Sequence, residues 1–395
     1  MKHYLKKTSS KILLTAVATA ITLPALAQVK IGVINSLSGN FAAFGQRYNT
    51  GLEVALEEIN AAGGINGQTI ELIKNDDRSD AQSALSALEG LNRQKVPIVI
   101  GSYASGITGP LSKTATRQKI PFIVLGSADD SITKPGSEWI FRAKHNSTIV
   151  AKTYIDYFDE MRKKDPSLKK LAIMHGNGAW PTSVSVAAEK LAKERGYEII
   201  GRQSYDQGAT DFRPILNKFR SEKVDILLTG SYADDGIAIA RQIIETGLGA
   251  KVIAIDTGSS MQSFIDQVGS AAENIVSTVT WSPDVQYEGT SELYKKLKDK
   301  SKDEPSFYEA EGYLALKIAA DALSRAESFD REDVKKALKN TNLKTAVTNV
   351  TFEDFDGFKG QNPIKSLIIQ IQNGKHVTVF PKEISAKEAK FSNSN

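Results

Sequence analysis

Short apolar runs rich in β-branched residues alternate along the chain with longer stretches whose apolar residues recur every three or four positions. The runs have the length and composition of buried strands, and the stretches have the period of amphipathic helices. This alternation predicts βαβ units and parallel sheets. In a first cycle we expect strands at 30–34, 69–74, 97–100 and 121–124 and helices at 44–62, 81–93 and 107–118.

A second cycle repeats the order and spacing of the first. Its expected strands are 170–174, 197–203, 224–228 and 251–255, and its expected helices are 181–195, 211–220 and 235–245. The repetition predicts an α/β protein with two similar lobes, each built on a doubly wound parallel sheet.

The remaining segments are too short to hold a core of their own. Three helical patterns (290–300, 308–324 and 331–339) precede an expected terminal hairpin at 366–372 and 377–380. We expect these segments to complete the lobes by crossing between them, which would form a multi-strand hinge beside a cleft. The expected division is 28–146 plus about 281–348 for lobe 1, 147–280 plus about 349–383 for lobe 2, and 384–395 for a tail.

The N-terminal segment has the features of a cleavable signal peptide. Four lysines precede an apolar run at 12–23, which is too short to span a membrane, and Ala25-Leu26-Ala27 forms a small-x-small cleavage pattern. Residues 1–27 are therefore predicted to be removed. The chain has no cysteine, so the cleavage site lacks a residue for a lipid anchor, and the predicted location is the periplasm.

Charge does not indicate a polyanionic partner. Without the four lysines of the signal segment, 46 of the 50 basic residues remain, against 46 acidic ones. This balance argues against nucleic acid or an anionic membrane as a partner. We expect the protein to act as a monomer.

Candidate catalytic and cofactor motifs are weak. His145, His175 and His376 are far apart and lack metal-ligand spacing, and no GxSxG elbow is present. The segment "GSYASGITGP" has no P-loop lysine, and the first turn, "NSLSGNFAAFG", is not a GxGxxG fingerprint. We therefore expect no enzymatic activity, no metal and no cofactor, although a triad assembled in space stays open.

Two acidic pairs, Asp76-Asp77 and Asp129-Asp130, could bind a cation. Such pairs more often cap helices or lie in solvent, which is the interpretation adopted here.

The loops that follow the strands offer a different kind of site. In a parallel sheet, ligands bind at the carboxyl ends of strands, where helix N-termini favour an anion such as a carboxylate. "GSYASG" lies at such an end, and Ser102 and Ser105 add hydroxyl donors. The second lobe has the matching loops "HGNGAW", "TGSYADDG" and "IDTGSS". There Trp180 and Tyr232 could cover an organic ligand or be ordinary packing residues, and Asp256 could pair with an amino group.

Longer motifs resemble a known family. The segment "IGVINSLSGNFAAFGQRYNTGLEVALEEINAAGGINGQTIELIKNDDRSD", with "VIGSYASGITGPLS", "ITKPGSEWIFR" and "GATDFRPILNKFRSEKVDILLTG", is similar to the periplasmic solute-binding proteins of ABC importers, in the leucine/isoleucine/valine-binding branch. The resemblance covers essentially the whole mature chain. It implies the type I periplasmic-binding fold, a small-molecule ligand bound by closure of the two lobes, and a membrane permease of an ABC importer as partner.

The resemblance also implies site residues. It assigns the ligand carboxylate to Ser105, with the backbone of Tyr103 and Ala104 beside it, and it directs Phe44 toward the ligand side chain. Further implied contacts are Ser127, Ala128 and Asp129 in the next loop, the covering residues Trp180 and Tyr232, and Asp256 or Thr257 for the ammonium group.

One loop departs from the family pattern. Many amino-acid binders have S-A-T or G-A-T where this chain has Ser127-Ala128-Asp129, and an acid here would repel a carboxylate unless it is turned away. The expected ligand is an amino acid, branched-chain or related, and an aromatic or aliphatic acid is the alternative. A ligand sensor for a membrane signalling partner is a further alternative.

Overall fold

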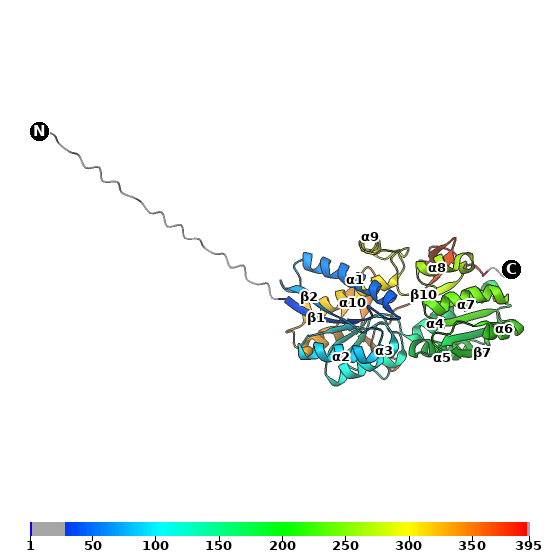
Figure 1. The fold of residues 1–395 in the computed structure, drawn as a ribbon, viewed down its shortest axis with the longest axis horizontal. Coiled ribbons are helices and arrows are strands. Elements are labelled where there is room, and N and C mark those ends of the chain that lie inside the picture. The colour runs from blue at the N-terminus through cyan, green and yellow to red at the C-terminus, as the bar shows by residue number, and fades with distance from the viewer. Residues whose placement is uncertain (2–27, 393–395) are drawn as a thin grey trace.

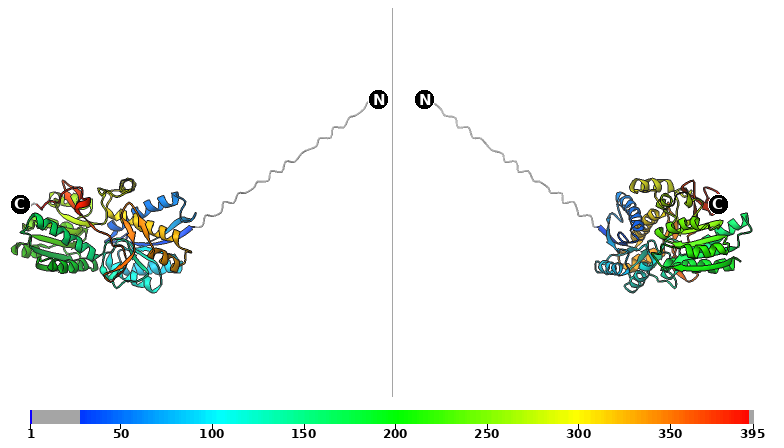
Figure 2. Two further views of the ribbon diagram at one scale, coloured as in Figure 1. Left: turned by 180° about the vertical axis from the view of Figure 1, so that it is seen from behind. Right: turned by 45° about the vertical axis from the view of Figure 1, so that its right-hand side comes forward.

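The computed structural model describes residues 1 and 28–392, so the predicted signal peptide lies almost wholly outside the described residues. Two α/β lobes lie side by side (Figures 1 and 2). Each contains a seven-stranded, mostly parallel sheet with helices on both faces, which confirms the predicted fold class. None of the helices in the described part of the chain has the length and apolar character needed to cross a membrane.

The first lobe contains a sheet in the order β13-β14-β5-β4-β3-β1-β2. Its strands are β1 (Gln28–Asn35), β2 (Thr69–Asp76), β3 (Val99–Gly101), β4 (Phe122–Val124), β5 (Ile140–Arg142), β13 (Glu353–Phe355) and β14 (Phe358–Gln361). Its helices are α1 (Ala42–Ala61), α2 (Ala81–Arg93), α3 (Ser105–Arg117), the single turn η1 (Asp130–Ile132), α9 (Thr290–Lys300), α10 (Phe307–Arg325) and α11 (Arg331–Lys339). A small hairpin, β11 (Asn342–Lys344) and β12 (Asn349–Thr351), follows α11.

The second lobe repeats this arrangement in the order β16-β15-β10-β9-β8-β6-β7. Its strands are β6 (Lys170–Gly176), β7 (Glu198–Tyr205), β8 (Ile226–Ser231), β9 (Val252–Thr257), β10 (Val276–Val279), β15 (Leu367–Gln372) and β16 (Lys375–Phe380). Its helices are α4 (Ser147–Lys164), α5 (Ala179–Glu194), α6 (Arg213–Ser221), α7 (Ala233–Thr246) and α8 (Gln262–Val268), with the turns η2 (Gly269–Ala272) and η3 (Lys382–Ile384).

The expected division between the lobes is wrong in one place. The expected lobe 2 segment begins at about 349, but β14 pairs with β5 and β13 pairs with β14, so both strands extend the sheet of lobe 1. Strand β12, which precedes them, pairs with β11 of lobe 1. The chain returns to lobe 2 at β15, which pairs with β10. The reason is that an edge strand joins whichever open sheet edge its crossing reaches, and this choice is not encoded in the local pattern.

Helix α4 was absent from the expected elements, although its pattern is helical. Its buried residues include Val150, Tyr154, Phe158 and Met161, which recur three or four positions apart. Asn146 caps the helix by accepting a hydrogen bond from the Ile149 N–H.

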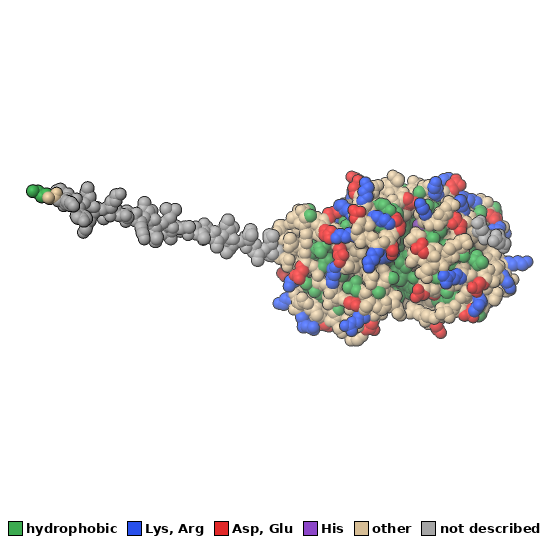
Figure 3. All heavy atoms as spheres, turned by 45° about the horizontal axis from the view of Figure 1, so that its top comes forward, with side chains coloured by type: hydrophobic (Ala, Val, Ile, Leu, Met, Phe, Trp, Pro, Cys, Tyr) green, Lys and Arg blue, Asp and Glu red, His purple; other side chains and the backbone are tan. Residues whose placement is uncertain are grey.

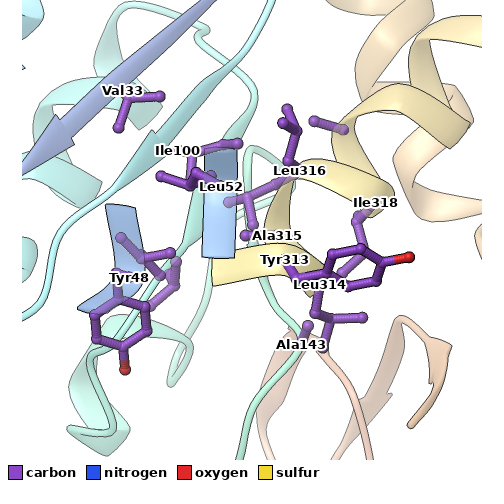
Figure 4. Close-up of a cluster of buried hydrophobic side chains, with 14 of the residues drawn as sticks. Val33, Tyr48, Leu52, Ile100, Ala143, Tyr313, Leu314, Ala315, Leu316 and Ile318 are labelled. Carbon is purple, nitrogen blue, oxygen red and sulfur yellow. The ribbon is translucent and has the colours of Figure 1, made fainter. Parts of the chain in front are cut away.

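The core of lobe 1 depends on close packing of α10 against α1. A Cβ at Gly51 would lie 1.8 Å from the Glu309 carbonyl oxygen, and one at Gly312 would lie 2.2 Å from the Tyr48 carbonyl oxygen. The two backbones can approach so closely because neither position has a side chain. Figure 4 shows Leu52 of α1, Ile100 of β3 and Leu316 of α10 in one buried cluster. The late helix α10 is thereby fixed to the first lobe.

Candidate functional site: the cleft between the lobes

A cleft separates the carboxyl ends of the two parallel sheets. In each lobe the strand order reverses direction at the first strand of the cycle, β1 or β6, and a ligand site is expected beside that strand. The cavity there has a volume of ≈ 420 Å³ when its opening to solvent is included. Figure 3 shows hydrophobic side chains at the junction of the lobes and charges of both signs over the outer surface.

Three parts of the chain line this cavity. Lobe 1 contributes Tyr103, Ser105, Gly126, Ala128, Lys144 and His145. Lobe 2 contributes Trp180, Tyr232, Asp256, Thr257 and Thr278. The start of α10 contributes Phe307 and Tyr308.

The N-terminus of α3 forms part of the lobe 1 wall. Ala104 is its N-cap residue, with extended backbone angles, and no side chain caps this helix end. Ser105 is buried in the first turn, and its hydroxyl oxygen accepts a hydrogen bond of 3.2 Å from the Asp129 N–H. Backbone N–H groups in a first helical turn lack intrahelical partners and attract negative charge.

The loop after β4 is held rigidly, and this explains the unexpected acid in it. The Ser127 hydroxyl donates to the Tyr103 carbonyl oxygen (2.8 Å), so it is used within lobe 1. The Asp129 carboxylate accepts from the Ser131 N–H (2.8 Å) and does not line the cavity. Buried Arg142 donates to the carbonyl oxygens of Ser127 (3.4 Å) and Asp129 (2.7 Å). The acid is thus turned away from the position where a carboxylate would bind.

In the two acidic pairs, the carboxylates cap a helix or hold turns, in agreement with the interpretation preferred in the sequence analysis. Asp130 accepts from the Thr148 N–H and hydroxyl at the start of α4. Asp76 accepts from the N–H groups of Leu37 and Ser38. These carboxylates order the loops at the edge of the cleft.

An aromatic cluster connects the two lobes. Tyr232 of lobe 2 lies 5.2 Å from Phe41 and 6.3 Å from Tyr103 of lobe 1, measured between ring centroids. Trp180 lies 5.3 Å from Tyr232 within lobe 2. Phe44 stacks on Tyr103 at 4.6 Å and does not line the cavity. Phe44 therefore supports the wall from behind, whereas Trp180 and Tyr232 lie at its surface.

Asp256 is the acidic group of the lobe 2 wall. Its Oδ1 atom accepts hydrogen bonds from the Tyr154 hydroxyl (2.8 Å), the Thr278 hydroxyl (2.7 Å) and the Thr278 N–H (3.3 Å). Burial raises the pKa of this carboxyl above its usual range, and the hydrogen bonds from Thr278 and Tyr154 oppose the shift. Neighbouring Thr257 adopts a left-handed conformation with φ of 60°, which is rare for a β-branched residue.

Several residues of the wall were not expected. Lys144 and His145 follow β5, and Thr278 lies in β10, neither of which was among the predicted strands. Because ligand sites lie at the carboxyl ends of strands, the segment "FRAKHN" (141–146) would have been a candidate if β5 had been recognised. Tyr308 comes from α10, whose position over the cleft depends on its packing against α1.

The two basic residues of this wall differ in charge. Burial lowers the pKa of the His145 imidazole well below its usual range, and the nearby charges of Lys144 and Arg142 lower it further, so the ring is neutral at pH 7. The Lys144 ammonium instead forms an ion pair of 3.2 Å with buried Glu311. The positive charge of the wall thus belongs to Lys144.

Among the expected site residues, the structure brings seven to the cavity: Tyr103, Ser105, Ala128, Trp180, Tyr232, Asp256 and Thr257. Phe44, Ala104, Ser127 and Asp129 lie next to these residues without lining the cavity. One wall therefore presents a helix N-terminus, and the other combines a buried carboxylate with aromatic rings. Such a pair of walls suits a small molecule that carries charges of both signs.

This fold and site are those of a two-lobed solute receptor, and a sequence comparison agrees. The model of the periplasmic binding protein family matches residues 28–375. The chain belongs to this family.

Similar proteins carry related names. The chain is 28% identical over 388 residues to Leu/Ile/Val-binding protein homolog 7 of Brucella abortus (strain 2308), an alignment that covers 93% of this chain and 95% of the relative. It is 27% identical over 392 residues to homolog 8 of the same strain, covering 95% and 96%.

Solved structures share the fold. A leucine-binding protein of Thermotoga maritima superposes with a TM-score of 0.79 at 23% identity, covering 89% of this chain and 97% of that one. A branched-chain amino acid transporter substrate-binding protein of Streptococcus pneumoniae in complex with isoleucine superposes with a TM-score of 0.77 at 24% identity, covering 88% of this chain and 97% of that one. A solute-binding protein of R. palustris in complex with benzoate gives 0.77 at 18% identity, covering 93% and 99%.

Proposed function

We propose that this protein is the substrate-binding protein of an ABC importer and captures a small amino acid in the cleft. One observation carries the proposal: the N-terminus of α3 with Ser105 faces the cavity from lobe 1, and buried Asp256 faces it from lobe 2. The names of the relatives support an amino acid as ligand. The predicted signal peptide supports a periplasmic location, with a membrane permease as partner.

Each end of an amino acid has a proposed partner. The carboxylate accepts hydrogen bonds from the Ser105 hydroxyl and from N–H groups of the first turn of α3, where the helix dipole favours an anion. The ammonium donates to Asp256, and Oδ2 is its proposed acceptor because the hydrogen bonds from Tyr154 and Thr278 meet at Oδ1. An acid without an ammonium group would leave Asp256 without a cation, which disfavours the aromatic or aliphatic acids.

Ligand binding is proposed to favour the closed lobes. The ligand's two charged ends contact opposite lobes, so it binds the closed state more tightly than the open one. Ala128 contacts the ligand, and Trp180 and Tyr232 cover it from lobe 2. Phe44, Ser127 and Asp129 act from behind the wall by fixing Tyr103 and the loop after β4. Capture and release of this kind need no chemical turnover.

A thermal-shift experiment tests the proposal. An amino acid at about 100 times its Kd should stabilise the wild-type protein by about 2.7 kcal/mol and raise its Tm by several degrees. The double variant Ser105→Ala/Trp180→Ala should lose this rise. Ser112→Ala is a matched control, because Ser112 lies on the same helix and its hydroxyl donates to the Gly109 carbonyl oxygen. An unchanged rise in the double variant would contradict the site assignment.

A further inference from the structure

Lys144 is a buried cation in the wall of the cavity, and the two ends of an amino acid do not require it. Its side chain is 6% exposed. Its ammonium group donates to the Gly126 carbonyl oxygen (3.0 Å) and to Glu311 Oε2 (3.2 Å). An ammonium has three N–H donors, and these contacts with described residues use two of them.

Glu311 holds this ammonium in place. Its Oε2 atom also accepts from the Tyr48 hydroxyl (2.6 Å), and its Oε1 atom accepts from the Thr280 hydroxyl (2.6 Å). These partners come from α1 and from the segment after β10, so the carboxylate is braced from two directions. The ion pair is neutral as a unit. Lys144 lines the cavity, its ammonium group lies 5.7 Å from the Phe307 ring centroid, and one of its N–H groups is not used by the two hydrogen bonds above.

The apolar surface near Lys144 is aromatic, namely the Phe307 ring, and aliphatic side chains are few. Among the described residues that line the cavity, Ala128 supplies the one purely aliphatic side chain. The other lining groups near the ends of β5 and β10 are polar, namely His145 and Thr278. Closing the lobes over an alkyl side chain would leave a buried N–H of Lys144 without an acceptor, which disfavours such a ligand.

We propose that Lys144 is a specificity-determining residue, and that the cleft prefers amino acids whose side chain carries an oxygen acceptor over branched-chain amino acids. The inference rests on the proposed function and names the ligand class within it. The third N–H of Lys144 donates to the side-chain oxygen, while the ligand's carboxylate and ammonium occupy the positions at Ser105 and Asp256. A site with a buried donor discriminates strongly against a shape-matched ligand that lacks the acceptor.

Calorimetric titration with shape-matched ligand pairs tests the proposal: leucine with asparagine, valine with threonine, and methionine with glutamine. For the wild-type protein we expect the oxygen-bearing member of at least one pair to bind at least ~10-fold more tightly. The variant Lys144→Met/Glu311→Gln should reduce that ratio to about 1, because it removes both the donor to the side-chain oxygen and the cost of burying that donor against a ligand without one. Both substitutions are needed because Lys144→Met alone would leave Glu311 buried without a cation.

Two measurements separate specificity from folding. Melting without ligand reports whether the double variant folds. Lys335→Met controls for the substitution itself, because Lys335 of α11 lies over the Trp139 ring and does not line the cavity. If the double variant does not fold, the wild-type ratios alone decide. Leucine, valine and methionine binding as tightly as their oxygen-bearing partners would overturn the inference and leave the proposed function standing. A preference that persists in the folded double variant would overturn the role of Lys144. Failure of every amino acid to bind would overturn both proposals.

Discussion

Lys144 in the first lobe and Asp256 in the second are both buried in the wall of the cleft, but they are held in different ways. The charge of Lys144 is compensated by Glu311 within the fold. The hydrogen-bond partners that hold Asp256 are the hydroxyl of Tyr154 and the hydroxyl and N–H of Thr278, which are neutral groups. Burial without a cation raises the pKa of Asp256.

Two lobes of the same strand order therefore present different chemistry to the cleft. The first lobe has a compensated, braced wall that can hold its geometry before a ligand arrives. The second lobe has a charge that a ligand's ammonium would compensate when the lobes close. The shared topology determines where the loops meet, whereas a few side chains at strand ends determine what they bind.

The largest expected effect comes from removing the charge of Asp256. Asp256→Asn should weaken amino acid binding at least ~100-fold, because a charge-assisted hydrogen bond to the ammonium is lost in a buried site. The free protein should be at least as stable as the wild type, since the cost of burying the charge disappears. Titration calorimetry measures the first effect and thermal melting the second. Asp235→Asn, in the same lobe and outside the cavity lining, is the control. Affinity within a few-fold of the wild type would argue against Asp256 as the ammonium partner.

An intermediate effect is expected at the aromatic contact between the lobes. Tyr232→Ala removes a ring that packs on Phe41 and Tyr103, and it should weaken ligand binding about 10-fold by destabilising the closed state. Tyr232→Phe keeps the ring and should bind as the wild type does. Small-angle scattering with and without ligand should show less complete compaction for Tyr232→Ala. Equal compaction in both variants would mean that this contact does not help closure.

The last effect concerns pH and the free energy of unfolding, and its sign differs between the lobes. In lobe 2, burial raises the pKa of Asp235 to about 6. As the pH rises from about 4 to 6, the unfolded chain releases this proton before the folded one, so the free energy of unfolding decreases by at most roughly 3 kcal/mol. Chemical denaturation from pH 3 to 7 should show that the stability of the wild type relative to Asp235→Asn decreases by this amount, since the other titrating groups contribute equally to both proteins.

In lobe 1 the sign is reversed at Glu58. Burial opposes ionisation there, but hydrogen bonds from Lys296, Lys317 and Tyr313 outweigh it and lower the pKa of Glu58 to about 2. Its stabilising contribution is present above about pH 4.5 and is lost as the pH falls toward 2. Glu58→Gln should therefore be less stable than the wild type at pH 7 and similar to it near pH 2. A difference between the two proteins that does not change with pH would contradict this.

Local patterns predicted most of the regular elements and failed where pairing is decided at long range. The expected helix at 81–93 matches α2, because its apolar residues show the helical period and Asp80 caps it. The short strands β5 and β10 were missed, and β13 and β14 were assigned to the wrong lobe. Strands of three or four residues are too short to show a period, so they are recognised from the pattern in some cases, such as β3 and β4, and missed in others. Their sheet partners far away in the sequence define them.

The candidate site divides in the same way. Ser105, Trp180, Tyr232 and Asp256 could be predicted because each follows or ends a recognisable strand. The direction of the Asp129 side chain could not be predicted, because it depends on η1 and on the contacts of Arg142 with the loop. No local pattern distinguishes an acid that faces a ligand from one that caps a turn.

By itself, the sequence determined that the chain forms two similar α/β lobes and that the carboxyl ends of their strands meet at a cleft. Hydrophobic periodicity is a local property that predicts the elements and the parallel sheets. In parallel sheets, ligands bind at the carboxyl ends of the strands. The tertiary structure alone decided which side chains reach the cavity. Lys144 and Glu311 are 167 positions apart, and they meet because α10 packs against α1 at Gly51 and Gly312. Their pairing depends on that packing, which brings together segments that the local sequence pattern does not connect.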